Sequence, residues 1–336
     1  MFGVKKPYSV KKMDGKKVLV LGGLGFIGSN TTHKCVSLGA EVTVFDAMIE
    51  PYGFNLENIR EIRDRIEFIK GDMRNFDALS QAVKGKDFVF NCAGQVSHID
   101  SMKMPFLDID LNVNANMNLL EACRKFNDSA KIVYAGTRAQ TGKAVYFPVD
   151  ETHPDNPVDI YGADKLVAEK HLLIYNNVYG IRGTSVRINT TFGTRHQMKH
   201  NLYGILNWFI RLALEGKAIT VFGDGKQVRD YNYIDDAVDA MVLCAQSKKA
   251  DGEVYMLGSK KPLRFIDMVK AVVKECNSGS VEFAAFPKDR KAIETGNVSI
   301  SFKKIKMALG WEPTTAFEDG LKTTVEFYRE KLPMYV

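Results

Sequence analysis

The chain has 336 residues, of which 45% are hydrophobic and 26% are charged, a composition typical of a globular protein with one large domain or two intimate ones. A formal net charge of +6 is modest and argues against a nucleic-acid partner. No apolar run approaches the ~18 residues of a membrane span, and no apolar secretory segment follows the N-terminus, so we expect a cytoplasmic protein without a membrane partner.

Several features outside the main pattern carry little chemistry. Residues 1–15 are rich in lysine and are predicted to form a solvated basic arm. His196 and His200 are four residues apart, but no acidic third ligand follows at a recognisable spacing, so no metal site is expected. The five cysteines form no C-x-x-C pair, and four of them are predicted to be reduced core thiols: Cys35, Cys92, Cys123 and Cys244.

Apolar, strand-like runs alternate with helix-like periodicity over the first 190 residues or so. This alternation predicts βαβ units with right-handed crossovers, and therefore a Rossmann-type α/β fold with a doubly wound parallel sheet. The expected strands span residues 17–21, 42–45, 66–69, 87–90, 132–134 and 183–188, and the expected helices span residues 27–38, 75–84, 105–125 and 157–178.

Beyond residue 193 the pattern becomes irregular, with turn-rich stretches such as FGDGKQVRD. Ligands of parallel sheets bind at the carboxyl ends of the strands, so a later segment must close over that edge. We interpret residues 16–192, together with roughly 230–258, as a Rossmann domain. Residues 193–229 and 259–336 are interpreted as a smaller α+β substrate-binding domain.

The stretch GGLGFIG, residues 22–28, joins the first predicted strand to the first predicted helix. Its glycines permit a tight turn and let backbone N–H groups approach a pyrophosphate at the helix N-terminus. Asp46 ends the second strand, 46 − 28 = 18 residues past the last glycine, where a carboxylate accepts hydrogen bonds from a ribose and repels a 2′-phosphate. The motif predicts NAD rather than NADP, with a purely structural glycine turn as the alternative. The predicted contacts are Gly22, Gly25, Phe26, Ile27, Gly28 and Asp46.

The loops after the third and fourth strands fall where the same dinucleotide is expected. Asp72 and Met73 follow the third strand, and an acid there can accept a hydrogen bond from an adenine amino group. Ala93, Gly94 and Gln95 follow the fourth strand, and the small residues let the backbone lie against the cofactor. Each loop alone is unremarkable, but together they predict one cofactor site.

Tyr161 and Lys165 open a predicted helix four residues apart and therefore share one face. A phenol with a pKa near ~10 is a poor base at neutral pH, but a nearby ammonium and a positive nicotinamide stabilise the phenolate. Tyr161 can then remove a proton from a substrate hydroxyl while the carbon is oxidised. Thr137 lies 161 − 137 = 24 residues earlier, at the end of the fifth strand, and offers a hydroxyl to the same substrate oxygen.

These motifs, in this order, resemble those of the extended short-chain dehydrogenase/reductase family, in its nucleotide-sugar epimerase and dehydratase branch. The resemblance implies bound NAD, a catalytic Thr137–Tyr161–Lys165 group and a nucleoside-diphosphate sugar as substrate. It also implies a homodimer formed through the helices near 105–125 and 157–178. The motifs run from about residue 16 to 330: GGLGFIG, Asp46, GDMR, NCAGQ, LNVNANMNLLEA, YAGTRAQTG, YGADK, RINTTFG, FGDGKQVRDYNYIDD and LGWEP.

The resemblance also assigns residues by position. It implies that Asn112 lies near the cofactor and the substrate diphosphate, and that Asn189 and Arg229 contact that diphosphate. Arginine suits bidentate phosphate contacts, and Arg290 is a weaker match to a second such residue. Arg195 is a further residue expected to face the substrate.

The stretch YAGTRAQTG, residues 134–142, limits the reaction. Family members that dehydrate the sugar place an acidic pair after the threonine, one acid to protonate the leaving hydroxyl and one to remove a proton from C5. Arg138 and Ala139 stand at those positions and supply neither acid. The expected reaction is therefore inversion at C4 of an NDP-hexose or NDP-hexuronic acid through a 4-keto sugar. Arg138 is a candidate contact for an acidic sugar.

Other functions stay open from the sequence alone. A 4,6-dehydratase, a reductase that consumes NAD(P)H, or an epimerase acting at C2 would use the same scaffold, and a non-catalytic nucleotide-binding regulator would share the fold. Leu21, Ala135-Gly136 and Thr141 depart from the family pattern without removing a catalytic group, and the last two lie near the expected sugar. The sequence names neither the nucleotide base nor the sugar.

Overall fold

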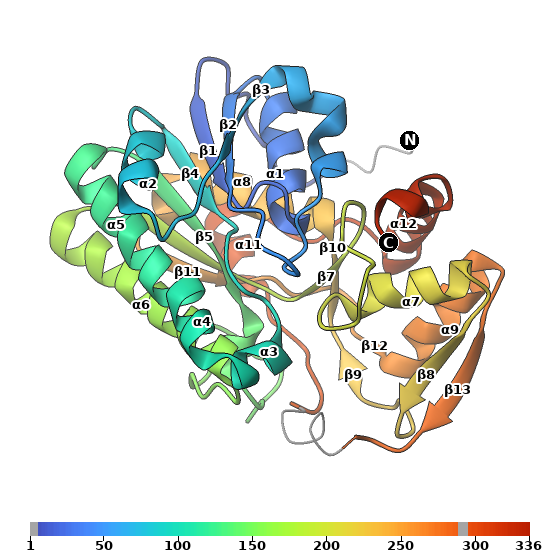
Figure 1. Cartoon of the computed structure of the whole chain (residues 1–336). Helices are drawn as coiled ribbons and strands as arrows, with labels where there is room; N and C mark the ends of the chain where they lie inside the picture. The colour runs from blue at the N-terminus through green and yellow to red at the C-terminus, as the bar shows by residue number, and fades with distance from the viewer. Residues whose placement is uncertain (1–5, 288–294) are drawn as a thin grey trace.

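The computed structural model describes residues 6–287 and 295–336. Its centre is a seven-stranded parallel sheet with the strand order β11-β6-β5-β4-β1-β2-β3 (Figure 1). The chain builds outward from β1 to β3, returns to β4 beside β1, and builds outward again, so the predicted doubly wound fold is confirmed. The strands are β1 (Lys17–Leu21), β2 (Glu41–Asp46), β3 (Ile66–Lys70), β4 (Phe88–Asn91), β5 (Lys131–Thr137), β6 (Gly183–Ile188) and β11 (Glu253–Met256).

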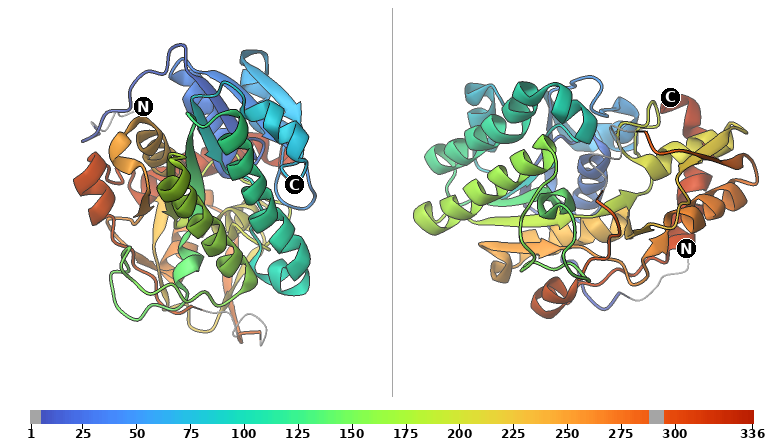
Figure 2. Two further views of the ribbon diagram at one scale, coloured as in Figure 1. Left: turned by 90° about the vertical axis from the view of Figure 1, so that its left-hand side faces the viewer. Right: turned by 90° about the horizontal axis from the view of Figure 1, so that it is seen from below.

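Helices cover both faces of this sheet (Figures 1 and 2). Val18 and Val20 of β1 pack into the core shared with α1 (Phe26–Ser37) and α8 (Ile234–Gln246). Leu19 and Leu21 point the other way and pack into the core under α2 (Phe76–Val83), α5 (Ala115–Phe126) and α6 (Ile160–Tyr179). Side chains of a strand alternate between faces, and both faces are buried here, which accounts for the continuous apolar runs in the sequence.

The helix predicted over residues 105–125 is a continuous helical run with an irregular middle. It comprises α4 (Pro105–Ile109), a π-helical turn η2 (Asp110–Asn114) and α5. Such turns are frequent at functional sites, and this one contains the predicted site residue Asn112. The short elements that no sequence pattern marked include α3 (His98–Lys103), η1 (Leu56–Arg65), η3 (Arg138–Thr141) and η4 (Lys248–Ala250).

A second, smaller part of the molecule lies beside the sheet, at the right of Figure 1. Its strands pair as β8 with β13 and β9 with β12, and a further pair, β7 with β10, comes from the segments interpreted as Rossmann domain. The division into two domains stays an interpretation, because α11 (Lys303–Leu309) packs back against β11 and η4 of the larger part. The remaining elements are β7 (Thr190–Phe192), α7 (Ile205–Leu214), β8 (Ala218–Phe222), β9 (Val228–Arg229), β10 (Tyr231–Tyr233), β12 (Leu263–Arg264), α9 (Phe265–Cys276), β13 (Ser280–Ala284), α12 (Phe317–Lys331) and η5 (Leu332–Met334).

The N-terminal segment is anchored from residue 6 onward, so the expectation of a solvated arm is wrong there. Tyr8 and Met13 are buried in the main core, and the Tyr8 hydroxyl donates to Asp239 of α8 at 3.2 Å. Lys6 pairs with the same carboxylate. The free energy gained by burying the Tyr8 and Met13 side chains favours the anchored segment, and it outweighs the tendency of the neighbouring lysines to keep the segment in solvent.

Three further expectations concern cysteine, histidine and membrane contact. All five cysteines are free thiols. His196 and His200 do not face a common point, because their ring nitrogens contact the backbone carbonyls of Gln197 at 2.9 Å and Pro51 at 3.1 Å. In the described part of the chain, no helix has both the length and the apolar character required to cross a membrane.

Candidate active site

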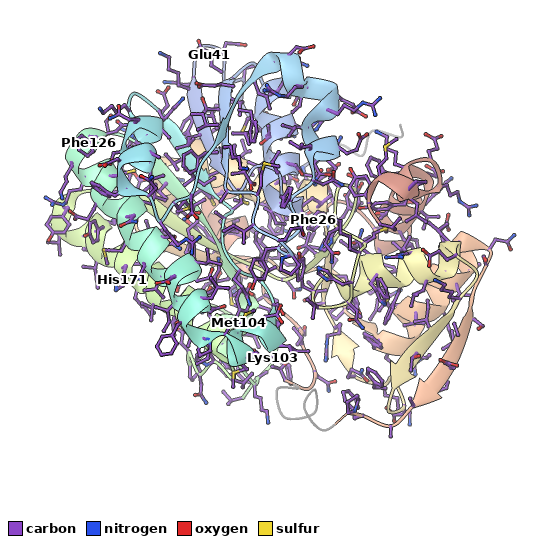
Figure 3. The ribbon with its side chains drawn as sticks, viewed as in Figure 1. Phe26, Glu41, Lys103, Met104, Phe126 and His171 are labelled. Carbon is purple, nitrogen blue, oxygen red and sulfur yellow. The ribbon has the colours of Figure 1, made fainter. Side chains whose placement is uncertain are left out.

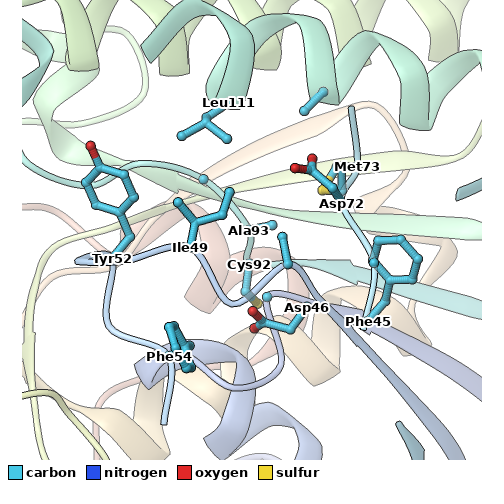
Figure 4. Close-up of a pocket in the computed structure, with 16 residues that line it drawn as sticks. Phe45, Asp46, Ile49, Tyr52, Phe54, Asp72, Met73, Cys92, Ala93 and Leu111 are labelled. Carbon is cyan, nitrogen blue, oxygen red and sulfur yellow. The ribbon is translucent and has the colours of Figure 1, made fainter. Parts of the chain in front are cut away.

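A cleft opens where β1, β2, β3 and β4 end (Figure 4). It encloses about 640 Å³ of empty space, part of which is open to solvent. Ligands of doubly wound sheets bind at this edge, next to the strand where the chain reverses direction. Many of the residues predicted to contact NAD line the cleft: Gly22, Gly25, Asp46, Asp72, Met73, Ala93 and Gly94.

The three glycines of the first turn serve different purposes. Gly22 has a φ of +71°, and a Cβ there would lie 2.8 Å from the backbone of Ala93. A Cβ at Gly28 would lie 2.1 Å from the carbonyl oxygen of Gly22, so this glycine lets α1 pack directly on the turn. Gly25 would meet nothing closer than 3.4 Å, yet it lines the cleft. Its missing side chain therefore keeps the cleft open rather than relieving a clash.

Phe26 and Ile27 begin α1 beside this turn. Their side chains pack on the main core and are not among the residues that line the cleft, so only their backbone N–H groups are available to a phosphate. The ring centroids of Phe26 and His196 are 4.4 Å apart, and this contact joins α1 to the smaller part of the molecule (Figure 3 labels Phe26).

Asp46 is a fixed acceptor on the wall of the cleft. Its carboxylate accepts hydrogen bonds from the N–H groups of Leu24 at 3.0 Å and Met48 at 2.9 Å. Burial raises the pKa of Asp46, and these two bonds partly offset the rise. Because backbone donors hold both oxygens in place, the carboxylate can accept further hydrogen bonds from the hydroxyls of a ribose.

The far wall of the cleft contains residues that the sequence did not indicate. Ile49, Tyr52 and Phe54 come from the irregular segment after β2, and Leu111 comes from η2. Figure 4 shows Tyr52 at one end of the cleft and Asp72 at the other. Asp72 pairs with Arg74 at 2.6 Å, which holds its carboxylate in place, and its contact with adenine stays a prediction. The segment after β2 has no hydrophobic periodicity, so nothing in the sequence could mark its apolar side chains as cleft residues.

Gly94, Gln95 and Asn112 form the deep side of the site. Asn112 is fully buried and donates to the Gln95 carbonyl at 3.1 Å and to the Asp108 carboxylate at 3.0 Å. Its Oδ1 has no donor among the described residues. Gly94 has a φ of +143°, and a Cβ there would lie 2.3 Å from this oxygen. An unsatisfied buried acceptor against a bare backbone fits a polar ligand with its own donors, as NAD is.

Thr137, Tyr161 and Lys165 are brought together by the end of β5 and the start of α6. Tyr161 and Lys165 lie on successive turns and are buried. Burial raises the pKa of Tyr161 to about 12, and the Thr137 hydroxyl, within hydrogen-bonding reach, counteracts the rise. The Thr137 hydroxyl also accepts from the Ala139 N–H at 3.2 Å, which fixes it at the strand end.

Lys165 connects this group to the cofactor cleft. Its Nζ lies 4.3 Å from the ring centroid of Tyr134, and burial lowers its pKa to about 8. Cys92, which lines the cleft, interacts electrostatically with Lys165. The ammonium therefore lies next to a residue of the cleft wall. None of Thr137, Tyr161 and Lys165 is itself among the residues that line the cleft. The cation that interacts with Tyr161 and favours its phenolate is Arg138.

Two pairs of side chains around Tyr161 were not predicted. His98 Nδ1 lies 2.6 Å from Asp159 Oδ2, and the rings of His98 and Tyr161 meet edge to face with centroids 5.0 Å apart. Asp164, next to Lys165, is hydrogen-bonded to Asp108, and burial followed by this contact raises the pKa of Asp164 to about 7. The two carboxyl groups therefore share a proton near neutral pH. Both pairs join α6 to residues about sixty positions earlier, which no local sequence pattern reports.

The predicted substrate residues are placed unequally. Asn189 follows β6 and is buried, and neither its Oδ1 nor its Nδ2 has a partner among the described residues. Arg138 donates to Thr295 Oγ1 at 2.9 Å and interacts electrostatically with Tyr161 and Asp159. Arg138 therefore lies near Tyr161.

Two further predicted arginines, Arg195 and Arg229, make contacts with other parts of the protein. Arg229 donates to the carbonyls of Val228, at 3.0 Å, and Gly296. Arg195 donates to Asn30 of α1 at 3.0 Å and lies 3.8 Å from Glu61 of η1, so its contacts face those elements rather than Tyr161. Arg290 lies outside the described residues. The roles of Arg195, Arg229 and Arg290 toward a substrate stay predictions.

The comparisons with known proteins agree with this geometry. A model described as "NAD dependent epimerase/dehydratase family" matches residues 18–258. A putative UDP-glucose 4-epimerase of Methanocaldococcus jannaschii is 31% identical over 93% of this chain and 98% of its own. A CDP-paratose 2-epimerase of Salmonella typhi is 28% identical over 91% and 97%. The crystal structure of a Thermus thermophilus UDP-glucose 4-epimerase in complex with NAD is 28% identical over 93% and 99%, with a TM-score of 0.83.

Proposed function

The chain belongs to the NAD-dependent epimerase/dehydratase family, with NAD as its cofactor, and we propose that it is a nucleotide-sugar epimerase that inverts C4. The observation that carries this proposal is the Thr137–Tyr161–Lys165 group, set beside the cofactor cleft with no carboxylate at positions 138 and 139. This group supports oxidation and reduction at one carbon and lacks the acids that dehydration needs.

The residues that would hold NAD are those that already shape the cleft. Asp46 is placed for ribose hydroxyls, the N–H groups of the first turn for the pyrophosphate, and Asp72 for the adenine. The unsatisfied Oδ1 of Asn112 is an acceptor on the deep side. When bound, NAD would accept a hydride from the substrate and return it, and its oxidised nicotinamide ring would supply a positive charge.

The chain's own residues manage the proton. Tyr161, as a phenolate stabilised by the Lys165 ammonium, removes the proton of the C4 hydroxyl as that carbon is oxidised to a ketone. The Thr137 hydroxyl donates to the same oxygen and holds it against Tyr161. The keto sugar then turns over, C4 is reduced on its opposite face, and Tyr161 returns the proton to the oxygen. Tyr161 takes up one proton and returns one, so the protons balance, and no cofactor is consumed overall.

The carboxyl groups nearest to Tyr161 do not replace the missing acids. Asp159 accepts from His98 and from the Gly162 N–H at 2.8 Å. Asp164 and Asp108 are hydrogen-bonded to each other. Asp108 Oδ1 and Asp164 Oδ2 have no hydrogen-bond partner among the described residues, but the two groups share one proton and so do not offer a separate acid and base for a leaving hydroxyl and a C5 proton. Dehydration of the sugar is therefore the weaker proposal.

The substrate is a nucleoside-diphosphate sugar in this proposal. Asn189 supports it, because an amide that is buried and unpaired has donors and an acceptor to give to a diphosphate or its sugar. Arg138 lies near Tyr161 and supports a sugar with an acidic substituent, such as a hexuronic acid. Arg229 and Arg290 are proposed as diphosphate contacts on the strength of the family resemblance.

The homodimer proposed for this chain would use the outer faces of α5 and α6. Several large apolar side chains there are exposed, among them Phe126 at 45%, Ile174 at 51% and Val178 at 65% (Figure 3 labels Phe126). Large apolar side chains exposed on two neighbouring helices are typical of a protein–protein interface.

Epimerisation at C2 is the second candidate, because one relative is a CDP-paratose 2-epimerase and the same group of residues can act at another carbon if the sugar is held differently.

The experiment that tests the proposed function is to incubate the purified protein, without added cofactor, with UDP-, GDP-, CDP- and dTDP-hexoses and UDP-hexuronic acids. A product of unchanged mass with inverted couplings at C4 is expected in the NMR spectrum. Inversion at C2 would favour the second candidate, and loss of water or carbon dioxide, or a requirement for NADPH, would contradict both.

A further inference from the structure

His98 and Asp159 form a pair beside Tyr161 that the proposed proton steps do not use. Their side chains differ sharply in exposure, 41% for His98 and 2% for Asp159, and 2.6 Å separates His98 Nδ1 from Asp159 Oδ2. The imidazole stands edge to face against the Tyr161 ring. Tyr161 is buried, whereas the neighbouring His98 side chain is partly exposed.

Asp159 holds this imidazole in one orientation. Asp159 caps the N-terminus of α6, where its Oδ1 accepts from the Gly162 N–H at 2.8 Å. Burial opposes ionisation, but the bonds from His98 and Gly162 keep the pKa of Asp159 below its usual range. An ionised carboxylate accepts only, so His98 must carry its hydrogen on Nδ1. That arrangement fixes the tautomer and leaves Nε2 as the group to be used.

Nε2 of His98 has no hydrogen-bond partner among the described residues and is not enclosed. The imidazole is in contact with the Tyr161 ring and is partly exposed, so a substrate bound at the Tyr161 hydroxyl comes close to His98. We infer that His98 contacts the sugar ring of the substrate through Nε2, and so helps to decide which hydroxyl group is presented to Tyr161. The inference rests on the proposed function, because it takes a nucleotide sugar as the ligand.

Two substitutions separate this role from a purely structural one. The amide nitrogen of asparagine lies near the position of Nδ1, so His98→Asn keeps the bond to Asp159 and loses the contact to the sugar. The amide of glutamine reaches the position of Nε2, so His98→Gln keeps a polar group for the sugar and gives up the bond to Asp159. If His98 served only to hold α3 against α6, His98→Asn would be harmless and His98→Gln would be the damaging change.

The test is calorimetric binding to the NAD-loaded protein. The ligand pairs are UDP-glucose with UDP, dTDP-glucose with dTDP, and CDP-glucose with CDP, and thermal unfolding checks that each variant is folded. His98→Asn is expected to weaken binding of the sugar nucleotide by about threefold to tenfold, the effect of one lost hydrogen bond, and to leave the diphosphate unchanged. His98→Gln is expected to lose less affinity for the sugar nucleotide than His98→Asn.

The possible results are distinct. Equal affinity of wild type and His98→Asn for the sugar nucleotide would overturn the inference alone. A greater loss of affinity for the sugar nucleotide in His98→Gln than in His98→Asn would also overturn the inference, in favour of a structural role for His98. If the wild-type protein bound none of these three sugar nucleotides, nor any GDP-hexose or UDP-hexuronic acid, the proposed function would fail as well.

Discussion

Replacing Gly25 with alanine should abolish NAD binding and spare the fold, whereas replacing Gly28 should damage the fold itself. A Cβ at Gly25 would have its nearest neighbour at 3.4 Å, an ordinary contact, so the cost is that of alanine at a helix N-cap, less than about 1 kcal/mol. A Cβ at Gly28 would lie 2.1 Å from the Gly22 carbonyl. That overlap with rigid backbone costs about 1–3 kcal/mol, and the gain of about 1 kcal/mol from better helix propensity offsets it only in part.

Thermal unfolding with and without NAD measures both effects. At about 100 times its dissociation constant, NAD should stabilise the wild-type protein by about 2.7 kcal/mol. For a chain of 336 residues each kcal/mol corresponds to about 1–2 °C in the midpoint, so the expected shift is about 4 °C. Gly25→Ala should unfold like the wild type without NAD and show no shift with it. A Gly25→Ala protein that NAD stabilises fully would refute the placement of the cofactor in this cleft.

Three further results are expected. Epimerisation should speed up with pH below about 8, as more Tyr161 phenolate forms, and level off above it, because Lys165 loses its proton there and supports that phenolate less; a rate that keeps rising without this break, or activity in Tyr161→Phe, would contradict the mechanism. Asn189→Ala should weaken binding of the nucleoside diphosphate in calorimetry and change the stability by less than about 0.5 kcal/mol, since no bond within the described protein is lost. Arg187→Met should lower the free energy of unfolding in urea by about 3–5 kcal/mol, because Glu169, 2.6 Å from the guanidinium, stays buried without its partner; a smaller effect than that of a surface arginine such as Arg60→Met would refute this.

The parts of the fold and site that depend on neighbouring residues were predictable from the sequence. Strand β6 lies where the apolar run 183–188 places it, and β5 ends at Thr137 as expected. The glycine turn and Asp46 meet in one cleft, because parallel strands bring their carboxyl ends to the same edge. The i, i+4 spacing of Tyr161 and Lys165 puts both on the buried side of α6.

The parts that depend on distant residues were not predictable. Tyr8 is anchored by Asp239, which lies 231 positions later, so the local sequence around it shows only lysines. His98 reaches Asp159 across 61 positions, and neither residue belongs to a recognisable motif of its own. Tyr52 lines the cleft from a segment without periodicity. In each case the contact follows from the tertiary fold, which hydrophobic patterns specify only in outline.

The position of Tyr161 is determined by polar contacts made along one helix rather than by apolar packing alone. Asp159 ties the first turn of α6 to α3, and Asp164 ties the next turn to α4. Glu169 ties the third turn to Arg187 of β6, where both side chains are almost fully buried. Each contact joins charged or proton-sharing groups in a poorly solvated place, where removing one partner is costly and a small shift cannot be screened by water. A phenol that must meet one hydroxyl of a sugar on either of its faces needs such a rigid support, and this explains why charged residues surround a helix whose catalytic part is buried.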